Sequence, residues 1–221
     1  MTADMRPIPL TLIVAATPSN AIGRSSSLPW RLSKEMAYFA RVTKGEDPSQ
    51  QGKKNAVIMG RKSWEGIPSK FRPLQDRINV VVSRQEGFDL GNSPQTHLAS
   101  SLEQAVELLE SDSTTLNRTF LIGGAQLYNQ SLSPSTSSSS SSQLPYLVNR
   151  VLLTRLLTEY EGCDTFLHPF TEDSAWKRAS HEELRDWAGW DVPEGVQSEK
   201  DRMVKDQDKI VEYEFQMWVK R

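Results

Sequence analysis

One acidic residue lies beside the apolar face of a predicted helix. The stretch SLPWRLSKEMAYFARVT predicts a helix over residues 33–44, with Ser33 as its N-cap. The apolar stripe of this helix is formed by Leu32, Met36, Phe39 and Ala40. At about 100° per residue, Glu35 projects to the same side of the helix, roughly 40° from Phe39.

Two interpretations of Glu35 follow from this position. If it is buried, desolvation raises the pKa of its carboxyl group, which can then donate or relay a proton. The same group can accept two N–H bonds from a cationic heterocycle. Alternatively, Glu35 is a solvated acid in the first turn of the helix, where the helix dipole favours a negative charge.

Three predicted turns that follow strands carry residues suited to phosphate groups. FLIGGAQLY places two glycines between a strand and the start of a helix, so that a backbone can come close to a ligand. VIMGRKSW ends its strand with Gly60, Arg61, Lys62 and Ser63, and INVVVSR ends with Ser83 and Arg84. Adjacent parallel strands end at one edge of a sheet, so the three turns together fit a dinucleotide, and the cations fit an extra phosphate as in NADP. A tight strand-to-helix turn and ordinary surface charge are the alternatives.

Other catalytic and metal-binding motifs are absent from the sequence. HEELR at 181–185 lacks the second His of a zinc-protease helix, because Arg185 occupies that position. The three His and the one Cys are not at metal-ligand spacings, and no G-x-S-x-G elbow is present. MGRKSW lacks a Gly directly before its Lys and is not a P-loop. We therefore expect no metal site.

These residues must be positioned by alternating strands and helices. Strands are predicted at 10–16, 55–60, 77–83, 118–124, 149–157 and 210–219. Helices are predicted at 33–44, at 101–110 with Ser101 as N-cap, and from Gly124 through Tyr128. This alternation predicts a mainly parallel sheet with crossovers. The strict alternation of VEYEFQMWV predicts instead an antiparallel edge strand at the C-terminus.

Length and composition restrict the class of protein. The 221 residues suit one α/β domain, 1–221, with a Ser-rich surface insertion near 131–145 and a long polar loop near 182–209. The 26 Lys and Arg nearly balance the 28 Asp and Glu, so charge gives no argument for nucleic acid or an anionic membrane as partner. The single Cys163 favours a reducing compartment, and we expect a cytoplasmic protein. No run approaches the roughly 20 apolar residues of a membrane span. Residues 6–16 have the basic residue and apolar run of a signal peptide, but Pro7 and Pro9 interrupt the start and the apolar run is barely long enough, so we do not expect one.

Four motifs together identify a family. They are IVAATPSNAIGRSSSLPWRLSKEMAYF, NAVIMGRKSWEGIPSKFRPLQDRINVVVSR, FLIGGAQLY and VLLTRL. In this order and with these gaps they resemble the dihydrofolate reductases over most of residues 10–166, and the final strand also fits. The resemblance implies NADPH-dependent reduction of 7,8-dihydrofolate to 5,6,7,8-tetrahydrofolate, with hydride transfer to C6 and protonation at N5. We expect an α/β single domain whose mostly parallel twisted sheet has about eight strands, an antiparallel C-terminal edge strand and about four flanking helices.

The resemblance also implies roles at a pterin site. Glu35 would bind the 2-amino and N3 groups of the pterin, Thr154 would hydrogen-bond near its carboxylate, and Trp30 would help to order a water; these are the expected catalytic residues. Arg77 would pair bidentately with the α-carboxylate of the glutamate tail. The other expected substrate-binding residues are Ile13, Val14, Met36, Phe39, Ile67, Leu74 and Ile122.

Further residues are implied at the cofactor. Ala15 and Ile22 would hold the nicotinamide carboxamide through their backbones, and Gly123 and Gly124, joined by a cis peptide bond, would lie against the pyrophosphate. The complete expected set is Ala15, Ile22, Gly23, Gly60, Arg61, Lys62, Ser63, Ser83, Arg84, Ile122, Gly123, Gly124, Ala125, Gln126, Leu127 and Tyr128. The loop GRSSSLPW would close over the site and exclude bulk solvent.

Dihydrofolate and antifolate inhibitors are the expected ligands of a monomer, with no nucleic-acid or membrane partner. Met36 stands where many members of the family have Phe or Leu, which leaves the antifolate preference open. Two alternatives remain: a relative that reduces another pterin-like or ribosylamino-pyrimidine substrate, and a non-catalytic NADPH or folate binding module. Arg77 argues against the first, because a substrate without a glutamate tail has no use for it. Glu35, Trp30 and the loop argue against the second.

Overall fold

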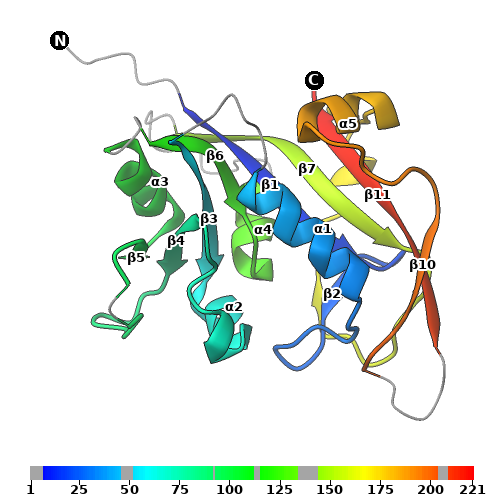
Figure 1. Ribbon diagram of the computed structural model, residues 1–221, viewed down its shortest axis with the longest axis horizontal. Coiled ribbons are helices and arrows are strands. Elements are labelled where there is room, and N and C mark those ends of the chain that lie inside the picture. Colours follow the sequence, from blue (N-terminus) through cyan, green and yellow to red (C-terminus); the bar gives the residue numbers. More distant parts are fainter. Residues whose placement is uncertain (1–6, 46–51, 92, 112–114, 134–143, 204–208) are drawn as a thin grey trace.

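The computed structural model describes residues 7–45, 52–91, 93–111, 115–133, 144–203 and 209–221 (Figure 1). The strands are β1 (Ile8–Ala16), β2 (Ala21–Gly23), β3 (Lys54–Gly60), β4 (Arg77–Val82), β5 (Thr96–Ala99), β6 (Leu116–Leu121), β7 (Tyr146–Leu156), β8 (Thr165–Phe166), β9 (Trp176–Arg178), β10 (Gln197–Lys200) and β11 (Ile210–Lys220). The helices are α1 (Ser33–Lys44), α2 (Arg61–Gly66), α3 (Leu102–Glu110), α4 (Ala125–Leu132) and α5 (His181–Ala188).

A nine-stranded sheet forms the centre of the domain. Its strand order is β10-β11-β7-β1-β6-β3-β4-β5, with β9 also paired to β11, while β2 and β8 form a separate two-stranded sheet. The strands from β7 to β5 are parallel to one another, β11 is antiparallel to β7, and β9 and β10 each pair antiparallel with β11. The expected mostly parallel α/β sheet is therefore confirmed. The C-terminal strand is antiparallel as predicted, but it is not an edge strand, because β10 pairs with its first residues and β9 with its last.

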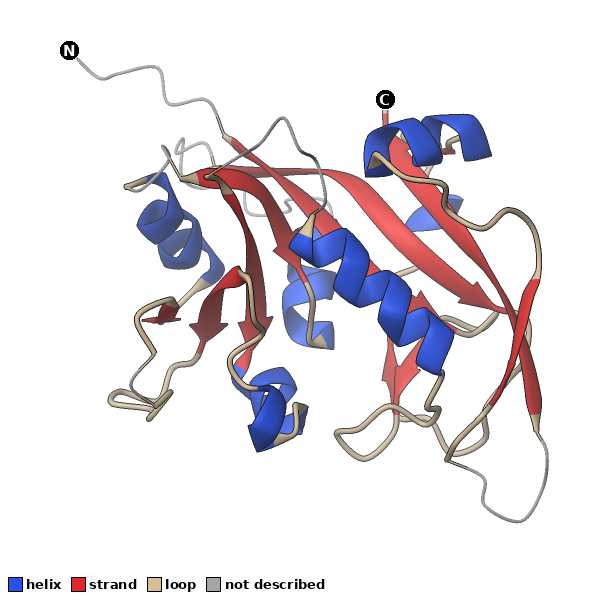
Figure 2. Ribbon diagram, in the orientation of Figure 1, coloured by secondary structure: helices blue, strands red, loops and turns tan. Residues whose placement is uncertain are grey.

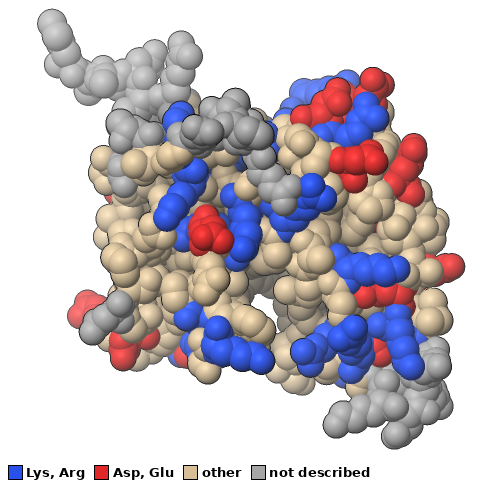
Figure 3. Space-filling model, in the orientation of Figure 1, with Lys and Arg blue, Asp and Glu red and all other residues tan. Residues whose placement is uncertain are grey.

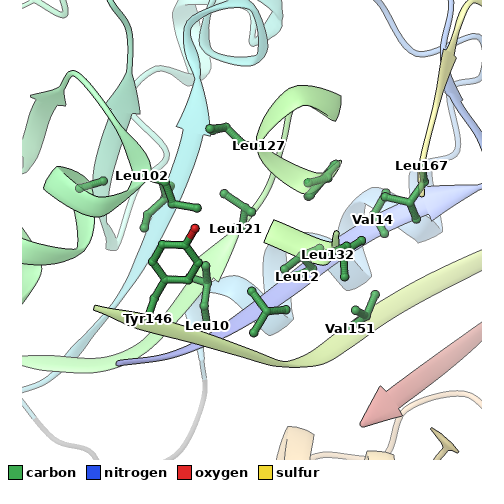
Figure 4. Close-up of a cluster of buried hydrophobic side chains, with 14 of the residues drawn as sticks. Leu10, Leu12, Val14, Leu102, Leu121, Leu127, Leu132, Tyr146, Val151 and Leu167 are labelled. Carbon is green, nitrogen blue, oxygen red and sulfur yellow. The ribbon is translucent and has the colours of Figure 1, made fainter. Parts of the chain in front are cut away.

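Helices cover both faces of this sheet, and the strands alternate between two apolar clusters (Figure 2). On β1, Leu10, Leu12 and Val14 point into the cluster that α3 and α4 cover (Figure 4). Ile13 points into the other cluster, which includes residues of α1 and α5. On β7, Leu152 and Leu156 belong to this second cluster, so the alternation of side chains places Thr154 on the face that α1 covers.

Helix α1 has the predicted bounds but not the predicted orientation. Its buried residues are Glu35, Tyr38, Val42 and Thr43. Met36, predicted as part of the apolar stripe, is 46% exposed. The expected N-cap is also wrong: Leu32 is the N-cap, it makes no side-chain capping bond, and Ser33 is already helical. Glu35 thus lies within the buried face rather than at its edge.

The other predicted elements agree with the structure in part. Ser101 caps α3 by accepting a hydrogen bond from the Gln104 N–H, as expected. The helix that follows Gly124 continues to Leu132. The long polar loop predicted at 182–209 is wrong as an unbroken loop, because it contains most of α5 and all of β10. Most of the Ser-rich segment, 134–143, lies outside the described residues. Within the described part of the chain, no helix is long and apolar enough to cross a membrane.

Candidate functional site

The central strands separate at their carboxyl ends. β1 pairs with β6 only over Leu10–Leu12, whereas it pairs with β7 as far as Ala16. Residues 13–16 therefore have a strand partner on one side only, and the Ile13 carbonyl accepts a hydrogen bond from the Tyr128 hydroxyl at 2.7 Å. In the space-filling view, the molecule is hollowed between α2 and the segment that joins β2 to α1 (Figure 3). Such a crevice at the carboxyl ends of parallel strands is where α/β folds bind ligands.

Glu35 is a buried acid on α1, with only 7% of its surface exposed. The Thr154 hydroxyl on β7 donates a hydrogen bond to its Oε1 at 3.2 Å. Burial raises the pKa of Glu35 to about 7, the Thr154 hydrogen bond opposes this, and the nearby Glu199 carboxylate adds to it. Among the described residues, no basic side chain forms an ion pair with Glu35 that would offset the cost of burial. Glu35 can therefore change its protonation near neutral pH.

Several apolar side chains on the α1 face of the sheet have intermediate exposure. Phe39, Ile67, Leu74 and Ile122 are partly buried and pack against the cluster on the α1 face. Met36 is the most exposed of the expected wall residues. Partial exposure of several apolar groups is typical of side chains that line a ligand cleft. Val14 differs from them, because its side chain belongs to the cluster on the opposite face and only its backbone could contact a ligand.

Arg77 is a buried cation at the start of β4. It is 5% exposed, and it donates to the Thr43 hydroxyl at 2.7 Å and to the Gln75 carbonyl at 3.0 Å. Burial lowers its pKa to about 10, which leaves it protonated at neutral pH. Among the described residues, it makes no ion pair with a carboxylate. The two hydrogen bonds fix the plane of the guanidinium group, and the nearby Asp76 carboxylate forms its ion pair with Lys44 instead. A fixed guanidinium group without a direct ion pair suits the recognition of an anion.

Two of the three predicted turns lie against each other. The Gly60 N–H donates to the Gly123 carbonyl at 2.7 Å, and the peptide bond between Gly123 and Gly124 is cis, as expected. A Cβ added at Gly123 would lie 3.1 Å from Oγ of Ser63, and one at Gly124 would lie 3.2 Å from it. Larger residues would therefore close the space between these turns.

The third turn follows β4, whose Val82 pairs with Gly60, and the remaining residues of the expected cofactor site differ in exposure and partners. α4 begins directly after Gly124 without a side-chain cap, so that its first N–H groups remain available to an anion. Ser83 is buried at the end of β4, and Lys62 and Arg84 are exposed. Arg61 differs from these cations, because it already pairs with Glu65 at 3.2 Å. Ile22 and Gly23 are buried, and Ile22 lies at an irregularity in the pairing of β2 with β8.

Trp30 lies at the end of the loop that precedes α1. It is 3% exposed, its ring contacts Tyr160 at 5.3 Å between centroids, and its buried indole N–H has no acceptor among the described residues. The Asp164 carboxylate accepts from the Ser25 N–H at 2.9 Å and thereby tethers this loop. Contacts with Tyr160 and Asp164 thus hold the loop before α1, and the spacing of its own residues does not predict them.

Sequence reasoning missed two carboxylates near the start of α1. Glu199 on β10 accepts from the backbone N–H groups of Lys34 and Glu35. Asp201 accepts from the Arg31 N–H at 2.9 Å and from the Tyr160 hydroxyl at 2.7 Å. Both follow α5 in a polar stretch without clear periodicity, so no local signal connects them with a helix far away in the chain.

Comparisons with known proteins agree on one family. The family model described as "Dihydrofolate reductase" matches residues 9–189. The chain is 46% identical to a dihydrofolate reductase of Cryptococcus neoformans, covering 95% of this chain and 94% of the relative. It is 42% identical to that of Pneumocystis carinii, with 96% of each chain covered. The solved structure of Schistosoma mansoni dihydrofolate reductase is similar, with a TM-score of 0.70 and 29% identity over 98% of this chain and 100% of that one.

Proposed function

The chain belongs to the dihydrofolate reductase family and reduces dihydrofolate to tetrahydrofolate with NADPH, and on this premise we propose how its own residues carry out the reaction. The observation that carries the proposal is the buried Glu35, whose pKa of about 7 and contact with Thr154 make it a proton-exchanging group beside the cleft.

The turns at the ends of β3 and β6 suit NADPH. Their glycines leave a narrow space beside Ser63 that a Cβ at Gly123 or Gly124 would fill, and the start of α4 offers free N–H groups to the pyrophosphate. Lys62 and Arg84 would take the phosphate on the adenosine side, and Ala15 and Ile22 would hold the nicotinamide through their backbones. When bound, NADPH supplies the hydride.

The apolar cleft and Arg77 suit the substrate. Met36, Phe39, Ile67 and Leu74 would pack against the pterin and benzoyl rings, because their side chains are apolar and partly exposed. Arg77 would hold the α-carboxylate of the glutamate tail through its fixed guanidinium group. This residue favours a substrate with a carboxylate tail over a tail-free pterin or a ribosylamino-pyrimidine.

Glu35 and Trp30 would control the proton that N5 receives. Glu35 would bind the 2-amino and N3 groups of the pterin, raise the basicity of N5 and polarise a water. The buried N–H of Trp30 would donate to that water, since it has no acceptor among the described residues. The loop 23–30 would exclude other solvent, and its bond to Asp164 supports a closed position.

We further propose that the protein acts as a cytoplasmic monomer that antifolates inhibit. The residues assigned to the site all come from one chain, so a partner subunit is not needed to complete it. A single cysteine and near-neutral charge agree with a reducing compartment and with no nucleic-acid or membrane partner. The exposed Met36 would contribute to the choice among antifolates.

A steady-state assay tests this proposal. The purified chain is supplied with NADPH and either dihydrofolate or the tail-free 7,8-dihydropterin, and NADPH absorbance is followed. We expect rapid oxidation with dihydrofolate, slower oxidation with NADH, and a much higher KM for the tail-free pterin. Equal kcat/KM for the two substrates would contradict the role of Arg77. If neither substrate is turned over, the protein would be a non-catalytic binding module and the proposal would be wrong.

A further inference from the structure

Glu199 connects strand β10 to the first turn of α1. Its Oε1 accepts hydrogen bonds from the backbone N–H groups of Lys34 and Glu35, each at 3.1 Å, and its Oε2 accepts from Lys34 at 2.9 Å. The Tyr213 hydroxyl on β11 donates to Oε1 at 2.9 Å and holds the carboxylate in place. Because Leu32 cannot cap α1 through its side chain, a carboxylate 164 residues away from Glu35 in the chain caps the helix instead.

We propose that Glu199 is a positioning residue for the reduction: it fixes the backbone of Glu35 and places a negative charge at the start of α1, which favours the protonated form of Glu35. This inference rests on the proposed role of Glu35. Glu199 itself touches neither substrate nor cofactor in this account, so it acts only through Glu35.

The electrostatic argument starts from the helix dipole. The free N–H groups of a first helical turn favour a nearby anion, and would therefore stabilise ionised Glu35 and oppose its role as a proton carrier. A carboxylate bonded to those N–H groups offsets their partial positive charge, and it also repels a second negative charge nearby. The pKa of Glu35 responds in this direction, since Glu199 adds to the increase that burial causes.

Among the described groups near Glu35, Glu199 is the one whose charge raises the pKa of Glu35. Thr154 on β7 is neutral and favours the ionised form through its hydrogen bond. Tyr38 on α1, Tyr128 on α4 and Tyr213 on β11 all have raised pKa values and remain neutral. The ammonium group of Lys34 donates to the Ser198 carbonyl at 3.2 Å, and no basic group acts on the pKa of Glu35 among the described residues.

Replacement of Glu199 by Gln separates charge from geometry. Gln keeps an oxygen that can accept from the same N–H groups but carries no charge. Asp201→Asn is the matched control, because Asp201 joins the same segment to Arg31 without acting on the pKa of Glu35. Glu199→Asp keeps the charge on a shorter side chain, and Glu199→Ser is a second neutral variant in case Glu199→Gln does not fold.

The chemical shift of the Glu35 carboxyl carbon is measured by NMR across a pH range in the ligand-free protein. Its signal is assigned as the one that is missing from the spectrum of Glu35→Gln. We expect the titration midpoint of Glu35 to move to lower pH by roughly half a unit or more in Glu199→Gln and Glu199→Ser. The midpoint should stay at the parent value in Asp201→Asn. In Glu199→Asp, which keeps the charge, it should lie closer to the parent value than in the neutral variants. An unchanged midpoint in folded Glu199→Gln would overturn the inference.

Turnover is measured on the same variants. The alkaline limb of kcat against pH should move to lower pH together with the NMR midpoint. If the NMR midpoint moves but the pH profile of kcat does not, Glu199 affects the pKa of Glu35 but does not affect the reaction. That result would overturn the positioning role of Glu199 and count against the proposed role of Glu35. The NMR result does not require any enzymatic activity, so the two failures are distinguishable.

Discussion

Replacing Glu35 by Gln should make the protein more stable, by an amount that depends on pH. The pKa of Glu35 is raised from 4.5 to about 7 in the folded protein. Between these two values the folded state binds more protons than the unfolded state, so this group lowers stability as pH rises. At about 1.4 kcal/mol per pKa unit, the loss reaches about 3 kcal/mol above neutral pH. Gln fills the same space and carries no charge at any pH.

Urea unfolding of both proteins across this pH range measures the effect. We expect nearly equal unfolding free energies below about pH 4.5, and a difference that grows to about 3 kcal/mol in favour of Glu35→Gln by about pH 8. Glu107→Gln, at an exposed site on α3, is the control for the same substitution outside the site. A pH-independent difference for Glu35→Gln would refute the reasoning, because Glu35 would then titrate as an ordinary acid.

Three further substitutions test other parts of the site. Thr154→Val removes the hydroxyl that favours ionised Glu35, so the alkaline limb of the kcat profile should move to higher pH; a move to lower pH would contradict the assignment. Arg77→Lys keeps the charge but loses the planar fork, so the KM for dihydrofolate should rise about tenfold or more while the KM for NADPH is unchanged, as steady-state kinetics would measure. Gly124→Ala places a Cβ about 3.2 Å from Oγ of Ser63, so NADPH should bind at least about tenfold more weakly in a fluorescence titration, and unchanged affinity would exclude a tight fit there.

The sequence predicts the central strands well, because their apolar runs are long and covered on both faces. It predicts the orientation of α1 less well. Met36 and Phe39 are apolar, as core residues are, but Met36 is largely exposed and the helix is buried through Tyr38 and Val42 instead. Periodicity cannot distinguish an apolar residue that packs in the core from one that lines a ligand cleft.

Of the residues that contact Glu35, one could be predicted from the sequence and one could not. Thr154 could be located from the sequence, because the resemblance over VLLTRL identifies it. Glu199 could not, because β10 is short and polar and its position depends on pairing with β11. Contacts between segments more than 100 residues apart are decided by strand order, which a single sequence does not specify.

The most direct test of the role of Glu35 is the single-turnover rate of hydride transfer to dihydrofolate in Glu35→Gln at neutral pH, with Glu107→Gln as control. If Glu35 controls the proton for N5, the rate falls by about 10²-fold or more while the variant remains folded and binds NADPH with unchanged affinity. A rate within about twofold of the parent protein would contradict the account, because a side chain without an exchangeable carboxyl proton would then suffice.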